Sequence, residues 1–363
     1  MPPLGSKWPG SIRQSSTWRR AARWAAVLCV VGLIGVLAVS LRLPLLVLEP
    51  GPAPDIAERT EIDAQTYPSE GSMHLTTAQV GRPKGATAAE VLAAIFASEQ
   101  VVFPRTAIYP AGRSDQETES IQAAQMTRSE LEAAVAALGE LGMPYRAEGV
   151  FVIEVLQGTP AAAELVAGDV ITAVDAKPVK DLRDLNRELA ARDGGERVRL
   201  EVLRGGEVKS FAVKTTGPPT EDKEDISPLG AKLADFRKAP IEVSISSRDI
   251  GGPSAGLMYS LSIYDRLVPE DLTKGWIIAG TGTIDNEDRT GVVGTVGSVG
   301  LKVRAAGRIG AQVFMVPKEE AEAAREAAGD GMQVIGVSTL KEAIGELRKL
   351  PPAEGGKKVE QKR

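Results

Sequence analysis

The chain has 363 residues, with 43 lysines and arginines against 48 aspartates and glutamates, one cysteine and one histidine. This length predicts two or three domains at about 100–200 residues each, and the mildly acidic balance gives no broad electrostatic footprint for nucleic acid. A single cysteine excludes a disulfide framework and a cysteine-rich metal site, and a single histidine excludes any site that needs two imidazoles. We therefore expect no metal, no cofactor and no nucleic-acid partner.

The first predicted element is a membrane-spanning helix over residues 24–48, where the apolar run is almost uninterrupted. About 20 apolar residues suffice to cross the hydrocarbon core of a bilayer as a helix. Basic residues precede the run, which places residues 1–23 in the cytoplasm and the rest of the chain outside; they are Lys7, Arg13, Arg19, Arg20 and Arg23. The alternative is a cleavable signal peptide, with small residues at 38–40 as the cleavage site.

Residues 49–143 follow as a juxtamembrane region in which no motif points to chemistry. A Pro-rich exit leads to a short strand around residues 71–77, and the spacing of apolar residues predicts helices over 87–100 and 128–141. An irregular stretch separates these two helices. We expect this region to be a spacer or a folded collar next to the membrane.

Residues 144–216 change character to short apolar strands, tight turns and one helix. A strand over 150–156 meets a Gly-Thr-Pro turn, a helix is predicted over about 181–192, and two strands surround a hairpin turn at Gly205-Gly206. This pattern resembles a PDZ domain of the bacterial protease type. The motifs that carry the resemblance are GVFVIEVLQGTPA, GDVITAVDAKPV and DLRDLNRELAA.

PDZ domains capture an extended peptide as an added strand. The resemblance implies that the receiving edge lies at Gly149, Val150 and Phe151. Glu148 stands beside this edge, where a carboxylate is an unfavourable neighbour for the free C-terminus of a peptide, so strict C-terminal recognition is not expected. A charged, Pro-rich linker over 217–228 follows.

A tight turn between a strand and a helix carries the first candidate for catalysis. Residues 241–245 alternate as a half-buried strand, and the sequence GGPSAGL at 251–257 leads into a helix predicted over about 254–264. The glycines and proline force the turn, which presents Ser254 near a helix N-terminus, where unpaired backbone N–H groups can hold an oxyanion. Alternatively, Ser254 is only the N-cap of that helix.

A serine nucleophile needs a base. The one histidine, His74, belongs to the juxtamembrane region, so a Ser-His-Asp triad is not expected. A lysine can serve instead when burial among apolar groups or a nearby positive helix end keeps it neutral. Lys302 follows a Gly-rich turn, opens an Ala-rich helix and has small and apolar neighbours. It is the candidate base, although its position alone also fits a surface lysine.

Four segments, in this order, resemble the proteolytic domain of Lon-type serine proteases: GGPSAGL, TGTI at 281–284, GSVGLKVRAA and AQVFMVP. With the PDZ-like segment and the membrane helix, the whole chain resembles the bacterial membrane-anchored PDZ–Lon proteins. The resemblance implies that Ser254 is the nucleophile, Lys302 the general base and Thr281 the residue that orients the lysine. It also implies an oxyanion hole made by backbone N–H groups around Gly252 and Ser254.

The fold implied by the resemblance is a multidomain α+β protein. Its Lon-type proteolytic domain, ribosomal protein S5 domain 2-like, would span 229–350 with a mixed sheet, before a disordered tail over 351–363. Alternating strands and helices after residue 275 support this fold and predict helices at about 300–309, 318–328 and 339–349. Lon domains generally assemble into rings, so the resemblance also makes a homo-oligomer plausible.

The segment before the candidate lysine departs from the Lon pattern, which usually reads Pro-Ile-Gly-Gly. Thr295 stands in place of the proline and Ser298 in place of the second glycine, and the stretch from Thr281 to Lys302 is longer than in Lon. These changes remove no reacting group. They can shift the position of Lys302, and a shift of a catalytic group by about 1 Å greatly lowers the rate of an enzyme.

No segment fits the phosphate-loop motif G-x-x-x-x-G-K-[ST], so we expect no ATP-driven unfolding module. The expected function is that of an ATP-independent serine endopeptidase on the outer face of a bacterial plasma membrane. It would cut extended protein or peptide segments that the PDZ domain recruits or gates. Two alternatives stay open: a catalytically silent PDZ scaffold, and a small-molecule kinase whose Gly-Ser turn cradles a phosphate.

Overall fold

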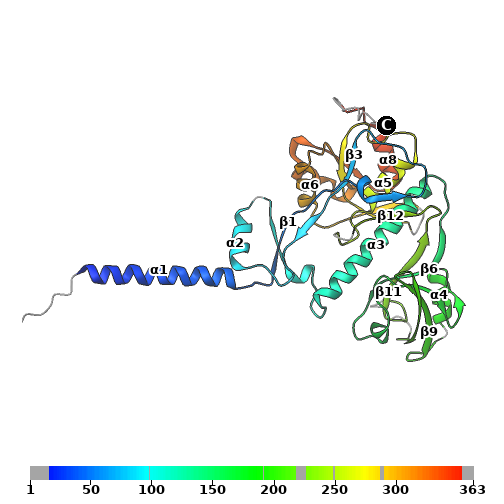
Figure 1. Ribbon diagram of the computed structural model, residues 1–363, viewed down its shortest axis with the longest axis horizontal. Coiled ribbons are helices and arrows are strands. Elements are labelled where there is room, and N and C mark those ends of the chain that lie inside the picture. The colour runs from blue at the N-terminus through cyan, green and yellow to red at the C-terminus, as the bar shows by residue number, and fades with distance from the viewer. Residues whose placement is uncertain are drawn as a thin grey trace, which may run out of the picture.

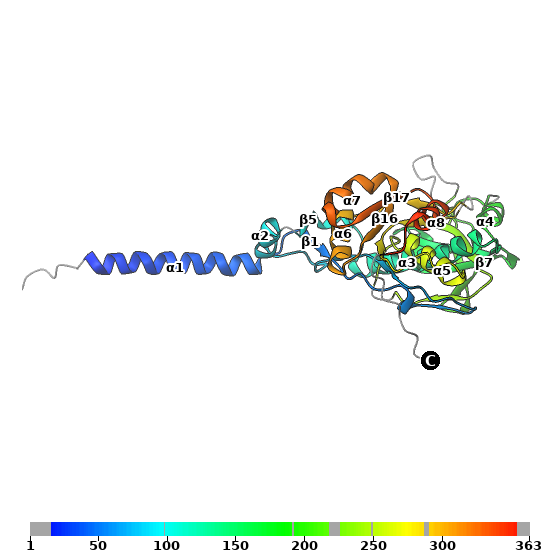
Figure 2. The same cartoon turned by 90° about the horizontal axis from the view of Figure 1, so that it is seen from above.

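The computed structural model describes residues 16–97, 99–190, 192–217, 226–247, 250–286 and 290–353. One long helix, α1 (Ser16–Ser40), stands away from a folded body that contains the other elements (Figures 1 and 2). The expected cytoplasmic segment, linker and tail lie partly outside the described residues, at 1–15, 218–225 and 354–363.

Helix α1 has the length and composition to cross a membrane. Its segment Arg20–Ser40 has 21 residues, none of them buried in the body, and it is the one candidate span within the described ranges. The helix ends at Ser40, and the prediction that it continues to residue 48 is wrong. Proline disfavours helical backbone at the residue before it, and after Pro44 the chain forms strand β1 (Leu45–Pro50), which buries every second side chain in the body.

Strand β1 is the centre of a three-stranded antiparallel sheet next to α1. The order is β4-β1-β5, with β4 at Ala78–Val80 and β5 at Val101–Pro104. Helix α2 (Ala88–Phe96) packs on this sheet and begins at a capping box, in which Thr87 and Glu90 bind each other's backbone N–H groups. It ends before the predicted residue 100.

A parallel four-stranded sheet forms the centre of the body. Its order is β17-β16-β13-β3, with bounds of Ser72–Leu75 for β3, Ile277–Gly280 for β13, Val313–Pro317 for β16 and Gln333–Val337 for β17. The sequence predicted a mixed sheet, but all three pairings are parallel. Strand β3 comes from the region expected to be a spacer or collar, so part of residues 49–143 is built into the central sheet, while β4, β5 and α2 of the same region belong to the small sheet next to α1.

Helices cover both faces of this sheet. One face carries α5 (Gly256–Leu267) and α8 (Leu340–Lys349), and the other carries α6 (Val299–Arg308) and α7 (Ala321–Ala328), each with its own apolar cluster. The predicted alternation of strands and helices in this region is confirmed. Two short antiparallel pairs border the unit: β2 (Thr60–Ile62) with β12 (Val243–Ile245), and β14 (Thr283–Asp285) with β15 (Val292–Gly294).

Helix α3 (Asp115–Glu140) is the element that joins the two halves of the body. It packs along α5 and also contacts strands β6 and β11 of a second sheet. The helix begins well before the predicted residue 128, because the Ser114 hydroxyl accepts the N–H of Glu117 and caps it. Its first half is mostly polar, so the apolar residues there do not show the spacing that predicts a helix.

The second sheet is antiparallel and has the order β10-β9-β7-β6-β11. The bounds are Arg146–Val155 for β6, Val170–Val174 for β7, Arg197–Arg204 for β9, Glu207–Lys214 for β10 and Ala231–Lys238 for β11. The short strand β8 (Lys177–Pro178) pairs with β7, and helix α4 (Leu182–Leu189) packs against β6 and β11. The predicted hairpin turn at Gly205-Gly206 is confirmed, with positive φ at both glycines.

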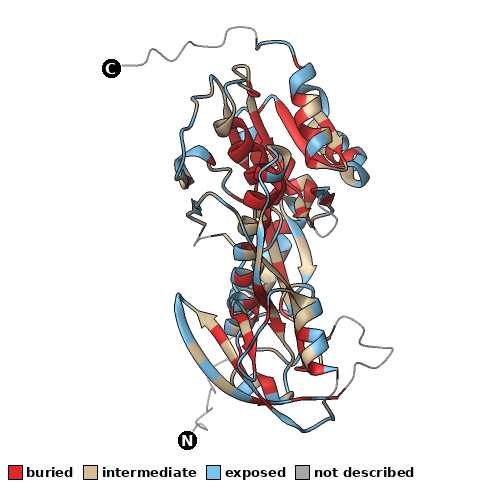
Figure 3. Ribbon diagram, turned by 90° about the vertical axis from the view of Figure 1, so that its right-hand side faces the viewer, coloured by how far each residue is buried: buried red, intermediate tan, exposed pale blue. Residues whose placement is uncertain are grey.

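Strand β11 corrects the predicted division of the chain. It lies in the segment assigned to the proteolytic domain, yet it pairs with β6 along its length, and Leu229 and Ala231 belong to the core of the second sheet. The sheet of this unit therefore continues past residue 216 to Lys238, because β6 would otherwise expose an unpaired backbone edge. Buried residues run through the centres of both units (Figure 3).

Candidate active site

The loop that carries Ser254 is held by helix α3. The carbonyl oxygen of Gln122 accepts the backbone N–H of Gly252 at 3.1 Å, and the hydroxyl of Ser129 donates to the carbonyl oxygen of Pro253 at 3.0 Å. Beyond the serine, Gly256 approaches β14 so closely that a Cβ there would lie 2.9 Å from Ile284. Helix α3 and the short strand β14 thus fix the serine loop from two sides.

Thr281 follows the carboxyl end of β13 and is fully buried. Its hydroxyl donates to the carbonyl oxygen of Ser254 at 3.0 Å, and the same carbonyl accepts the N–H of Gly282 at 2.9 Å. The amine of Lys302 donates to the Thr281 hydroxyl at 3.0 Å. Thr281 therefore joins the serine loop to the lysine, and the structure brings all three predicted residues together.

Lys302 lies in the first turns of α6 with 5% of its surface exposed. Burial lowers the pKa of its amine to about 8, and the negative charge of Glu320 opposes this shift. Burial disfavours the charged form of an amine because the surrounding apolar groups cannot replace water. Half of the lysine is consequently neutral near pH 8, the form in which an amine accepts a proton.

Glu320 is a residue that the sequence reasoning missed. Its carboxylate accepts the N–H of Val296 at 2.9 Å, in the turn that precedes α6. The contact stabilises the segment where Thr295 and Ser298 replace the residues of the Lon pattern, and Ser298 there adopts left-handed backbone with φ 59°. Nothing in the local sequence marks Glu320, because its partner is a backbone amide 24 residues away.

Within the described residues no hydrogen bond joins the Ser254 hydroxyl directly to the Lys302 amine. Catalytic hydrogen bonds are often long or misaligned in the absence of substrate and tighten on binding. His74 is not an alternative base for Ser254, because its ring nitrogens bond the carbonyl oxygen of Ala53 and the hydroxyl of Ser72, both at 2.9 Å. In the described part of the chain, no group of three His, Cys, Asp or Glu side chains is placed to hold a metal ion.

The predicted oxyanion hole needs a correction at Gly252. The backbone N–H of this glycine is already bonded to Gln122, since the left-handed conformation of Gly252, with φ 86°, turns the amide toward α3. Ser254, by contrast, stands just before the first turn of α5, where backbone N–H groups have no partner inside the helix.

The predicted peptide-receiving edge at Gly149, Val150 and Phe151 is wrong. These residues belong to β6, which pairs with β7 on one side and with β11 on the other. A strand with two neighbours has no backbone groups left for a third. In the described sheet the outermost strand beside helix α4 is β11, so the open edge falls on residues 231–238.

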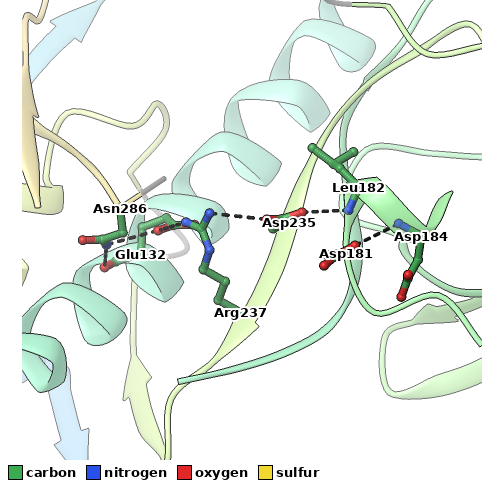
Figure 4. A network of polar contacts seen from close by, with 7 residues as sticks. All are labelled: Glu132, Asp181, Leu182, Asp184, Asp235, Arg237 and Asn286. Atoms are coloured by element: carbon green, nitrogen blue, oxygen red, sulfur yellow. Dashed lines mark hydrogen bonds and ion pairs between the residues drawn. The ribbon is translucent and has the colours of Figure 1, made fainter. Parts of the chain in front are cut away.

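A buried polar network links this edge to the central unit (Figure 4). Asp235 of β11 accepts the N–H of Leu182 at the start of α4, at 2.8 Å. Two residues on, Arg237 forms an ion pair of 3.2 Å with Glu132 of α3. The carboxylate of Glu132 also accepts the side-chain amide of Asn286, which follows β14, at 3.1 Å. The second sheet and the segment after β14 are thus both tied to α3 by one chain of contacts.

Comparisons with known proteins identify the second sheet. Residues 123–215 match the PDZ domain family. Over 92 residues the chain is 36% identical to the periplasmic pH-dependent serine endoprotease DegQ of Escherichia coli (strain K12), covering 24% of this chain and 20% of that protein. Over 107 residues it is 34% identical to Lon protease 2 of Bacillus subtilis (strain 168), covering 29% and 18%.

A crystal structure of the PDZ domain of an SdrC-like protein from Listeria monocytogenes is 26% identical, covers 24% of this chain and 87% of that one, and has a TM-score of 0.21. The chain contains a PDZ domain and is homologous to PDZ-containing serine proteases. It spans about a fifth of the length of the curated relatives named above.

Proposed function

We propose that this chain is an ATP-independent, membrane-anchored serine endopeptidase of the Lon type, with Ser254 and Lys302 as its catalytic dyad. The observation that carries the proposal is the buried amine of Lys302, joined through the Thr281 hydroxyl to the loop of Ser254. A buried amine with a pKa of about 8 can act as a base under ordinary conditions, which an exposed lysine cannot. The 34% identity to Lon protease 2 supports the same reaction class.

In the proposed reaction the Ser254 hydroxyl attacks the carbonyl carbon of the scissile peptide bond while neutral Lys302 takes its proton. The lysine then protonates the departing amine, and a water that it deprotonates releases the acyl group from the serine. Because Thr281 accepts one N–H of the amine, the lone pair of Lys302 is free to face Ser254. The N–H of Ser254 is the donor that we assign to the developing oxyanion.

The PDZ domain gives the proposed enzyme a peptide-binding surface. An extended substrate would add to the open edge of β11 beside α4 and gain main-chain hydrogen bonds there. We place this body on the outer face of a bacterial plasma membrane, with α1 as the anchor and the N-terminus in the cytoplasm. The printed name of the relative DegQ, a periplasmic endoprotease, supports that side of the membrane. Assembly into a homo-oligomer is part of the same proposal.

A second candidate function is a binding protein without catalysis. The observation that favours it is the absence, within the described residues, of a direct Ser254–Lys302 hydrogen bond, together with the Gly252 amide being occupied by Gln122. In that case the PDZ domain would bind partners and the buried lysine would be structural.

The deciding experiment maps new peptide termini by mass spectrometry after incubating the detergent-solubilised full chain with unfolded protein substrates, without ATP. We expect cleavage by the parent protein and none by Ser254→Ala or Lys302→Ala. Matched controls are Ser246→Ala and Lys318→Ala, which change exposed residues outside the site and should cleave normally.

Near-normal turnover by Lys302→Ala would contradict the dyad. Absence of cleavage by the parent protein, combined with specific capture of peptides, would favour the binding protein.

A further inference from the structure

A cavity of about 240 Å³ lies beside the serine loop and belongs to both units of the body. Its walls come from α3, from Pro253 and from β14, and Ile153 of the PDZ sheet contributes to the lining. Its polar lining residues are Gln125, Arg128, Ser129, Glu132, Thr283 and Asp285. Pro253 precedes the candidate nucleophile in the chain. A substrate side chain next to the scissile bond therefore has this cavity within reach.

Of these lining residues, Ser129, Glu132 and Asp285 already have partners. The Ser129 hydroxyl donates to the carbonyl oxygen of Pro253. Glu132 is neutralised by Arg237 and accepts Asn286 as well. Asp285 also has an interaction partner. None of these groups needs a ligand to satisfy it.

Arg128 differs from the other three. Its Nε is buried and has no hydrogen-bond partner among the residues that the structure describes. Buried donors are nearly always satisfied, so an unpaired one is a donor that a bound group can use. A guanidinium has five N–H donors and no acceptor, and its planar fork matches the two oxygens of a carboxylate.

We propose that this cavity binds a carboxylate of the peptide substrate next to the cleavage site, with Arg128 as its partner. This inference rests on the proposed function and specifies its substrate preference. The side chain of an internal Asp or Glu is one source of the carboxylate, and the C-terminus of a short peptide is the other. Because Ile153 forms part of the wall, the site is complete only when the PDZ domain is seated against α3.

The test compares cleavage of C-terminally amidated peptides that carry Glu or Gln at each position around the cut. For the parent protein we expect kcat/KM to be roughly tenfold to hundredfold higher with Glu at one position. Arg128→Gln should lower kcat/KM for the Glu peptide to that of its Gln counterpart, and Arg128→Glu should shift the preference toward Lys. The matched control Arg325→Glu makes the same charge change on an exposed face of α7 and should leave the preference intact.

A preference seen only with free C-termini would assign the cavity to the terminal carboxylate. Ser254-dependent cleavage without any preference for a carboxylate, or an equal loss on all peptides in Arg128→Gln, would overturn the inference and leave the proposed function standing. If the chain cleaves nothing, the proposed function fails, and binding of the same peptides still decides the inference. A Glu peptide should then bind at least tenfold tighter than its Gln counterpart, and Arg128→Gln should remove the difference.

Discussion

The carbonyl oxygen of Gln122 lies 3.1 Å from the backbone nitrogen of Gly252 and accepts its N–H. One partner belongs to helix α3, in the region that the sequence suggested was a spacer, and the other belongs to the loop of the candidate nucleophile. Ser129 adds a second contact from the same helix, to Pro253. The geometry of the serine loop therefore depends on residues outside the segment that resembles Lon.

A fragment covering residues 229–350 should consequently neither fold cooperatively nor cleave peptides. It lacks α3, which holds the serine loop, and β3, which pairs with β13. We expect no cleavage and a non-cooperative thermal transition by circular dichroism. Residues 41–353, which keep both elements, are the control. A cooperative, active fragment would show that α3 is dispensable.

The rate of the proposed reaction should follow the titration of Lys302. Its pKa of about 8 makes the amine mostly charged at lower pH, so kcat/KM should fall about tenfold per pH unit below that value and level off above it. Glu320→Gln removes a negative charge that raises the lysine pKa, and should move the inflection to lower pH. Glu322→Gln, at an exposed position of α7, is the control. An unmoved profile in Glu320→Gln would rule out this electrostatic coupling.

Thr281→Val should damage catalysis more than folding. The valine keeps the volume but loses the hydroxyl that contacts both Lys302 and Ser254, and misplacement of a catalytic group by about 1 Å costs about 10²-fold in rate. Thr281→Ser keeps the hydroxyl and should retain activity within a few-fold. Steady-state kinetics and thermal melts separate the two effects. Equal activity of the two variants would contradict the bridging role.

Asp265 predicts a dependence of stability on pH. Burial raises the pKa of its carboxyl from 3.8 to about 6, although Ser69 and the Leu272 N–H donate to it. The folded state therefore holds a proton that the unfolded state has lost, and the free energy of unfolding should fall by about 3 kcal/mol as pH rises from about 4 to about 6.

Other carboxyl groups titrate in the same range, so urea unfolding should be compared between the parent protein and Asp265→Asn at each pH. The difference between the two proteins should change across this window. A constant difference would mean that Asp265 does not titrate as described.

Substitutions of Glu132 and Arg237 should have strongly non-additive effects on the free energy of unfolding. Arg237→Met alone leaves the buried carboxylate of Glu132 without its ion-pair partner, and breaking a buried pair by removing one partner costs about 3–5 kcal/mol. The double variant Glu132→Leu/Arg237→Met should lose less, because no buried charge remains unpaired. Urea unfolding of the four proteins gives the coupling energy, and additive losses would contradict it.

The sequence predicted the structure correctly where turn residues and the spacing of nearby apolar residues determine it. The glycine pair at 205–206, the strand–turn–helix around Ser254 and the helices after residue 290 follow from turn chemistry and apolar period, and the structure contains them. The approximate position of Lys302 on a helix was predictable for the same reason.

The sequence failed where distant segments pair. Strand β3 has four residues and looks like any short strand, but its parallel neighbour β13 is some 200 residues away. Strand β11 follows a linker, which suggested a domain boundary, although its partner β6 precedes the linker. Contacts such as Gln122 with Gly252 involve backbone atoms and leave no trace in residue type.

The wide separation of strand partners also sets an order of events during synthesis. The central sheet needs β3 and also β13, β16 and β17, which are made much later, while the PDZ sheet needs β11. Pairings between such distant segments form slowly, because a long loop must close first. The sheet end that carries Thr281 therefore assembles only after the chain from β3 through β16 has been made. For the proposed protease, this order keeps the nascent chain inactive until these strands have paired.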